Sequence, residues 1–483
     1  MQNIFRHRIP ANLVRRTICC VAAVFLAAVF LTPRPAHAVP SFARQTGVAC
    51  EACHTVFPEL TPFGRDFKMN GYILQNANEV SAISEKNKKI LTLADLPPIS
   101  FMFDASMTST NRSVPDTVVG GREQNAQVEF PQQASFFYAG KIAPHLGAFV
   151  QLTYSGPNDA FSADNTDIRA VDTGAIGSAD IVYGLSFNNN MTVEDVFNSV
   201  PAWGFPFWAS ATAPTPTART VIDGTLAQDV AGLTAYFQIN RSFYGEAGVY
   251  RTARLGQPAP LSSIDSNVVE GVAPYWRFAY EHRWGHNSWE AGTFGTHVVL
   301  APGSADATGT SCTTASGTPG FCNSITSGPY NYFTDAALDT QYEFIGDRDI
   351  FTVTGVWIHE NAERDADVAF GSASRLNSVL QTARLSAEYF YERTYGASIQ
   401  YFTTWGDADP VLYAPASVTG SNNGKPNSNG EVFELNYVPW LNTKLSLQYV
   451  AYNEFNGASS NYDGFNRNAS DNNTLLLNFW FAF

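Results

Sequence analysis

The sequence has little charge. Asp, Glu, Lys and Arg make up 15% of its 483 residues, against roughly 25% in an ordinary soluble domain. Basic residues are the scarcer kind, with 29 Lys and Arg against 43 Asp and Glu, which gives a net charge of −14. So acidic a chain argues against nucleic acid as a partner. Aromatic residues, in contrast, reach 13%, which excludes an intrinsically disordered chain.

Long hydrophobic runs are also scarce, and the one that stands out lies at the N-terminus. Residues 18–31 are apolar, follow a basic stretch without acids at residues 2–16, and precede Ala36-His37-Ala38, the small-x-small pattern of a signal-peptidase site. We therefore predict a secretory signal, residues 1–38, cleaved after Ala38, with a retained N-terminal anchor as the alternative. Cleavage removes five arginines and no acid, so the net charge falls from −14 to −19. Downstream, no run is long enough for a transmembrane helix.

Cysteine is rare, and after the signal its residues form two separated pairs. The first pair lies in Cys50-Glu51-Ala52-Cys53-His54, a C-x-x-C-H pentad. In c-type cytochromes the two thiols of this pattern add to the haem vinyl groups, and the histidine is the proximal iron ligand. A redox dithiol or a zinc site would need a thioredoxin-like context or further ligands nearby, yet the next histidine is His145. The pentad predicts one covalently attached c-type haem.

Residues 39–97 form the expected haem-binding cap, which is too short to hold a conventional core alone. Thr61-Pro62 predicts a helix start and Asn70-Gly71 a helix end, so a short helix is expected over residues 62–69. The aromatic residues expected to pack on the porphyrin are Phe42, Phe57, Phe63, Phe67 and Tyr72.

Three residues of this short helix are further haem-site candidates. Arg65 and Lys68 lie within one turn of each other, so either could meet a haem propionate, with simple solvation of both as the alternative. Met69 is the candidate distal ligand, because a thioether ligand raises the reduction potential. The alternative for Met69 is packing, the commoner role of a methionine.

The remaining residues, 98–483, alternate between apolar and polar side chains. In the last segment, Leu475, Leu477, Phe479, Phe481 and Phe483 share one face, while Thr474, Asn478 and Ala482 share the other. Lipid on one side and a polar lumen on the other produce this pattern in bacterial outer-membrane barrels. At roughly 24 residues per strand and loop, this length predicts an all-β, antiparallel transmembrane barrel of about 16 strands. A soluble sandwich or propeller would need polar faces toward water or a recurring blade signature, and neither is present.

Short and long connections alternate along the predicted barrel. Tight turns are expected at Asn240-Arg241, Asp347-Arg348 and Glu392-Arg393, on the periplasmic side, and long external loops at residues 302–329 and 406–430. Within the first of these loops, we expect Cys312 and Cys322 to form a disulfide.

The cap resembles that of the outer-membrane cytochrome–porin fusions, a family that includes the iron-oxidising cytochromes of ferrous-iron-oxidising bacteria. Besides the pentad, the resemblance lies in Pro40-Ser41-Phe42-Ala43-Arg44-Gln45-Thr46-Gly47, Pro58-Glu59-Leu60-Thr61-Pro62-Phe63-Gly64-Arg65 and Phe67-Lys68-Met69-Asn70-Gly71-Tyr72. It implies a single c-type haem in or under the mouth of a barrel, passing electrons from an external donor to periplasmic carriers. The family usually carries Leu where this chain has Met69, which weakens Met69 as a shared ligand.

Two functions of different class follow. In the first, the protein is an oxidoreductase of the outer membrane that moves electrons from an extracellular donor, Fe(II) first, to a periplasmic carrier such as a soluble cytochrome. The acidic chain suits a cationic donor. The acidic tract of His359-Glu360 with Glu363, Asp365 and Asp367, at an expected external strand end, offers ligands suited to ferrous iron, with simple solvation as the alternative. In the second, the protein is a diffusion porin whose haem cap is a plug, gate or structural element. A conduit for a donor other than iron is a variant of the first.

Overall fold

The computed structural model describes residues 40–48, 50–55, 59–74, 79–82, 91–94, 97–115, 125–200, 209–252, 268–301 and 329–483. The predicted signal peptide and the predicted Cys312–Cys322 disulfide lie outside these residues.

Sixteen antiparallel strands of the described chain close into one barrel. Each strand pairs with its neighbours in sequence, and β18 pairs with β3 to complete the ring. The strands are β3 (Ile99–Thr110), β4 (Gln127–Ala143), β5 (Leu146–Ser155), β6 (Ala160–Ile176), β7 (Ala179–Asn188), β8 (Ala231–Ile239), β9 (Phe243–Arg251), β10 (Ala273–Trp284), β11 (Asn287–Leu300), β12 (Asn331–Ile345), β13 (Asp349–Arg364), β14 (Asn377–Tyr391), β15 (Tyr395–Gly406), β16 (Ser428–Trp440), β17 (Thr443–Glu454) and β18 (Thr474–Ala482). The predicted fold class and strand number are confirmed.

The few helices are short. They are α2 (Pro40–Thr46), α3 (Cys50–Cys53), α4 (Pro62–Met69), α5 (Met191–Glu194), α6 (Asp365–Phe370) and the 3-10 helix η1 (Ala469–Asn472), and a separate hairpin pairs β1 (Glu79–Ala82) with β2 (Leu91–Ala94). Helix α4 has the predicted bounds, because Thr61 caps its start and Asn70 its end. Among the described residues, no helix is both long and apolar enough to cross a membrane.

Side chains of the barrel wall alternate between lipid and lumen. On β10, Trp276, Phe278 and Tyr280 point outward, whereas Arg277 and Glu281 are buried inside. On β18, the predicted apolar face is the outer one. A closed barrel that is apolar outside and polar inside is the outer-membrane type, because closure leaves no strand edge and the outer side chains match the lipid.

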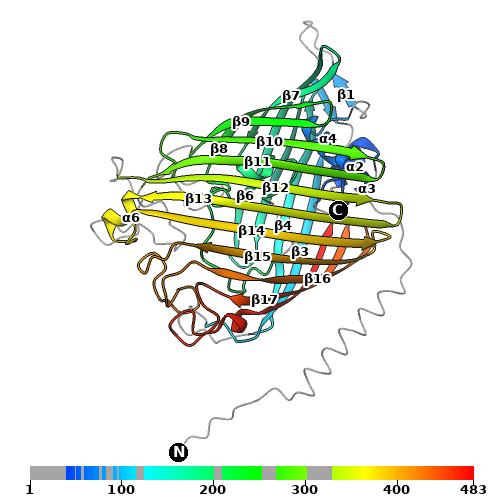
Figure 1. The fold of residues 1–483 in the computed structure, drawn as a ribbon. Coiled ribbons are helices and arrows are strands. Elements are labelled where there is room, and N and C mark those ends of the chain that lie inside the picture. Colours follow the sequence, from blue (N-terminus) through cyan, green and yellow to red (C-terminus); the bar gives the residue numbers. More distant parts are fainter. Residues whose placement is uncertain are drawn as a thin grey trace, which may run out of the picture.

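The two ends of the barrel differ. The predicted tight turns at Asn240-Arg241, Asp347-Arg348 and Glu392-Arg393 join neighbouring strands. Helices α2, α3 and α4 lie at the end that carries the C-terminus, and α6 lies at the opposite end (Figure 1). Short turns mark the periplasmic end of an outer-membrane barrel, so α2 to α4 lie at that end.

The described residues between 40 and 74 form a plug in the barrel lumen, which we call the luminal plug. The ring of Phe42 stacks on Tyr72, and Phe67 packs edge to face against both. The three rings also pack against the inner wall at Phe137 and Phe149. Packing of these rings on a porphyrin stays a prediction; the partners that the structure describes are one another and barrel residues. Phe63 is exposed, and Phe57 lies outside the described residues. The chain then enters the barrel at Ile99, close to the predicted boundary.

A second segment crosses the lumen. The described residues of the β7–β8 connection, between 189 and 230, run along the inner wall, and we call them the lumen loop. Its backbone N–H groups at Val221 and Ile222 donate to the carboxylates of Glu360 and Asp335, and Asp223 forms a bidentate ion pair with Arg384 at 2.9 and 3.0 Å. The sequence does not predict that this segment lies inside the barrel, because its composition does not distinguish it from an external loop.

Candidate functional site

The cysteine pentad is held against helix α4. Thr61 Oγ1 donates to the carbonyl of Ala52 at 2.5 Å, and the Thr61 N–H donates to the carbonyl of Cys53 at 2.9 Å. A Cβ at Gly64 would lie 2.1 Å from the Cys53 oxygen, so the close approach of α4 to α3 requires glycine there. The described residues 50–55 and 59–64 therefore form one locally determined unit.

His54 is oriented by the backbone of the same unit. Its Nδ1 lies 3.2 Å from the carbonyl oxygen of Glu59, and His54 forms a β-bridge with Leu60. Donation from Nδ1 to a carbonyl selects the tautomer in which Nε2 carries the lone pair, as in metal-ligating histidines. From the barrel, the Arg393 guanidinium approaches the carbonyls of His54 and Thr55 at 3.5 and 3.4 Å.

Cys53 is a reduced, half-buried thiol. Burial raises the pKa of the Cys53 thiol to about 11, the opposite of the lowered pKa of a redox-active C-x-x-C dithiol. Within the described ranges, no three His, Cys, Asp or Glu side chains are placed to hold a metal ion. The donor set fits a c-type haem: two cysteines one helical turn apart, then a histidine whose Nδ1 faces a carbonyl. The Cys50 side chain lies outside the described atoms.

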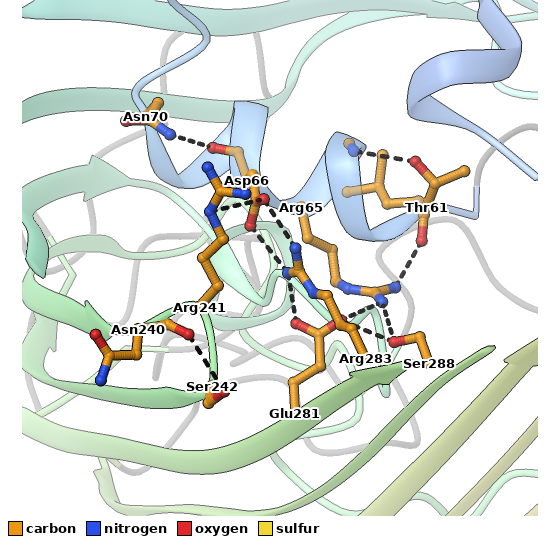
Figure 2. A network of polar contacts seen from close by, with 12 residues as sticks. Thr61, Arg65, Asp66, Asn70, Asn240, Arg241, Ser242, Glu281, Arg283 and Ser288 are labelled. Atoms are coloured by element: carbon orange, nitrogen blue, oxygen red, sulfur yellow. Dashed lines mark hydrogen bonds and ion pairs between the residues drawn. The ribbon is translucent and has the colours of Figure 1, made fainter. Parts of the chain in front are cut away.

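Arg65 anchors the luminal plug to the barrel wall. Only 1% of it is exposed, and its Nη2 lies 2.6 Å from Glu281 and 2.7 Å from Glu343. Burial acts to lower the pKa of this guanidinium, but the two carboxylates outweigh it and raise the pKa. Figure 2 shows Arg65 reaching from α4 toward Glu281 and Ser288.

The next residue of α4 extends this network. Asp66 accepts from both terminal nitrogens of Arg283 at 2.8 and 2.9 Å, and Arg283 also pairs with Glu281 at 2.7 Å. Arg241, on the β8–β9 turn, lies 3.9 Å from Asp66 (Figure 2). Two successive residues of α4 thus pair with charged side chains of the barrel.

Lys68 connects the plug to the lumen loop. It is 6% exposed, and its Nζ donates to the carbonyls of Val193 and Asp195 at 2.5 and 2.9 Å. Burial and the neighbouring Arg169 lower the pKa of Lys68 to about 8. The solvated alternative is therefore wrong for both Arg65 and Lys68. Their predicted contact with a haem propionate stays a prediction, and the structure shows their donors engaged by barrel and loop.

Met69 is 0% exposed. It lies in an apolar cluster with residues of the lumen loop and of β8 to β10, namely Val196, Phe197, Tyr236, Tyr244 and Ala279. The Tyr236 hydroxyl donates to its carbonyl at 2.7 Å. Packing accounts for this placement, and the role of distal ligand stays a prediction.

The acidic tract at the end of β13 does not converge on one point. Alternation places Glu360 inside, bonded to the lumen loop, and leaves His359 on the outer face beside Trp357. Neighbouring residues of a strand point to opposite faces, so this pair cannot share a metal ion. The expectation of ferrous ligands at His359-Glu360 was wrong for this reason.

Space remains in the lumen beyond the plug. A cavity of about 390 Å³ lies between Glu59 and Leu60 of the plug, the lumen loop, and the inner faces of β12 to β17. Its wall carries hydroxyl, amide and charged side chains and also apolar ones. The sequence does not predict it, because its lining residues are scattered between Glu59 and Tyr452.

Comparison with known proteins adds little to this description. No family model matches the sequence, and no curated protein matches it. Similar solved structures include the outer membrane channel DcaP of Acinetobacter baumannii (10% identity, TM-score 0.43, 80% of this chain and 96% of that chain) and the anion-selective porin from Comamonas acidovorans (10%, 0.41, 80% and 98%). A loop-deletion mutant of OmpT from Vibrio cholerae is similar at 10% identity and a TM-score of 0.42, over 80% of this chain and 98% of that one. At these values the neighbours carry no argument about function. The closed strand order itself shows that the chain is a porin-like outer-membrane barrel of sixteen strands.

Proposed function

We propose that the protein is an outer-membrane electron conduit, in which the luminal plug carries one c-type haem and electrons pass from an extracellular donor to a periplasmic carrier. One observation carries this proposal: the cysteine pentad stands on a plug that buried ion pairs hold inside a closed barrel. A redox centre on the plug would lie within an otherwise insulating membrane.

The residues of the plug have distinct tasks in this proposal. Cys50 and Cys53 would hold the haem and His54 would ligate its iron, which supplies a one-electron redox centre when bound. The Glu59 carbonyl orients the His54 ring, while Arg393 and Arg65 fix the unit to the barrel.

Fe(II) is the donor that we propose first. The mature chain carries a net charge of −19 if the signal is removed, and an acidic surface attracts cations. A donor of another kind is the variant to be tested beside it.

Haem attachment is tested by replacing one thiol. Cys53→Ser should weaken the peroxidase-stained band on a denaturing gel, because only the Cys50 thioether can then form. Cys312→Ser is the matched control, since it removes a cysteine outside the pentad and should keep the band. Absence of a stained band in the wild-type protein would contradict both the covalent haem and the electron-conduit function.

Electron transfer is tested on the membrane-embedded protein. Adding Fe(II) at controlled pH should reduce the Soret and α bands, and His54→Ala should abolish this response. Stained protein that no Fe(II) concentration reduces would eliminate iron as the donor but leave the conduit open to other reductants.

A restricted pore is the second candidate function, and the luminal cavity favours it. The plug and the lumen loop narrow the barrel but leave a cavity of about 390 Å³. Solute flux through liposomes that contain the Cys53→Ser variant would support this function, because that variant cannot hold the haem by both thioethers. Equal flux in liposomes without protein would exclude it.

A further inference from the structure

We propose that the luminal cavity is a binding site for a small uncharged solute rich in hydroxyl groups, which makes passage through the lumen selective. The inference rests on the second candidate function, the restricted pore, and names its solute class. The site adjoins the pentad through Glu59 and Leu60, but neither Cys53 nor His54 is among the described residues that line the cavity.

The charges of the cavity wall argue against an ion as the occupant. Three acids and three bases line it. Arg384 is held by Asp223 through two hydrogen bonds, and Lys444 lies 3.5 Å from Glu434. An ion filter requires a ring of one sign, and this wall has opposite charges close together. An uncharged solute meets no net repulsion here.

Two acceptor atoms of the wall point to a hydroxyl-bearing ligand. Gln341 is 7% exposed, its Nε2 donates to Glu343 at 3.2 Å, and its Oε1 has no partner among the described atoms. Asn198 Oδ1, on the lumen loop, also lacks a partner there. Buried acceptors of this kind are satisfied by a donor from a ligand or from water, and a solute hydroxyl supplies that donor.

The rest of the wall matches the same chemistry. Thr382 and Thr404 hydroxyls lie 3.2 Å apart, and hydroxyl groups both donate and accept. Beside them, the rings of Phe402 and Tyr452 pack edge to face at 5.7 Å and offer an apolar surface. A few placed polar groups around an apolar patch are typical of small-molecule sites of this size.

Calorimetry on the full-length protein in detergent tests the site. Erythritol, glucose and sucrose are the probes, and glutamate and lysine the charged comparisons. We expect saturable binding of at least one uncharged probe and none of the charged ones. Asn198→Gly removes one acceptor and keeps the positive φ of 55° that this position has, while Gln341→Leu removes the other. Each should weaken binding roughly three- to tenfold, the loss of one hydrogen bond.

Gln151→Leu is the matched control, because Gln151 is also a buried glutamine of the inner wall whose Oε1 lacks a partner among the described atoms, but it lies on β5 and does not line the cavity. It should leave binding unchanged. Lack of saturable binding overturns the proposal and means that the cavity holds water only. Equal binding of glutamate or lysine also overturns it, and so does binding that survives both acceptor variants, because the solute would then not use these two acceptors. Flux of the same probes into liposomes distinguishes the pore from the binding site. Binding without flux would contradict the restricted pore but support the site. Flux that does not saturate would contradict the site but support the pore.

Discussion

At the scale of single residues, Arg65 is the strongest link between plug and barrel. Its guanidinium lies between two buried carboxylates on β10 and β12. Removing one partner of a buried ionic cluster leaves uncompensated charge, which costs about 3–5 kcal/mol. We expect Arg65→Ala to loosen the plug by that order, measured as faster protease cleavage of residues 40–74 in detergent-solubilised protein.

The control for Arg65 is Arg241, which contacts the same helix from the surface. Its side chain is 77% exposed and 3.9 Å from Asp66, and exposed pairs contribute about 0–1 kcal/mol. Arg241→Ala should leave the cleavage rate nearly unchanged. Equal cleavage of the two variants would show that buried charge is not what holds the plug.

Lys68 makes the stability of the plug depend on pH. Burial lowers its pKa to about 8 in the folded protein, against about 10.4 in an unfolded chain. Between these values the unfolded state binds more protons, so stability rises with pH in this window and the burial penalty is present in full below pH 8. The free energy of unfolding should rise by up to about 3 kcal/mol across this window.

The measurement is the melting temperature of the protein from pH 7 to 10, compared between wild type and Lys68→Met. The wild type should gain stability relative to the variant as pH rises above 8. The difference isolates Lys68, because all other titrating groups are common to both proteins. A difference in melting temperature between the two proteins that stays constant from pH 7 to 10 would contradict the lowered pKa of Lys68.

At the scale of elements, the contact between α3 and α4 depends on one missing side chain. Alanine in a helix is ordinarily more stable than glycine, by about 0.5–1 kcal/mol. At Gly64 the new Cβ would lie 2.1 Å from the Cys53 carbonyl, so Gly64→Ala should instead destabilise the plug and displace the pentad. The readouts are the protease assay above and the stained haem band.

Gly355→Ala is the control for this substitution, because the nearest atom to its added Cβ is 3.6 Å away. It should retain both the band and wild-type protection. If Gly64→Ala retains them too, α3 and α4 have room to separate and the close contact is not essential.

Helix α4 also shows how far local reasoning reaches. Its bounds were predictable because Thr61, Pro62 and Asn70 act on backbone groups within four residues. The partners of its side chains were harder to predict. The sequence suggests haem propionates or solvent for Arg65 and Lys68, whereas the structure shows carboxylates of the barrel around Arg65 and carbonyls of the lumen loop around Lys68.

At the scale of the whole molecule, the barrel closes without the plug. Strand pairing runs through all sixteen strands and joins β18 to β3, so the wall makes its own hydrogen bonds. We expect deletion of residues 40–74 to leave a folded barrel with a wider lumen. In planar bilayers the conductance should rise several-fold, since the plug fills one end of the pore.

The lumen loop sets the limit of this effect. It stays bound to the wall through Asp223 and the N–H groups of Val221 and Ile222, so the deletion variant should remain narrower than a variant that also lacks the Asp223–Arg384 pair. Unchanged conductance after deletion of the plug would mean that the loop alone closes the lumen.

The sequence by itself determined the barrel, its strand number and the pentad, because period-two alternation and a C-x-x-C-H motif are local patterns. Only the tertiary structure decided which charges meet. Arg65 is separated from Glu281 by 216 residues and from Glu343 by 278, and nothing near Arg65 distinguishes these carboxylates from the other acids of the chain. The path of the lumen loop and the cavity beneath it were likewise hidden. Such partners depend on strand register and barrel closure, which bring distant side chains to the same level of the lumen.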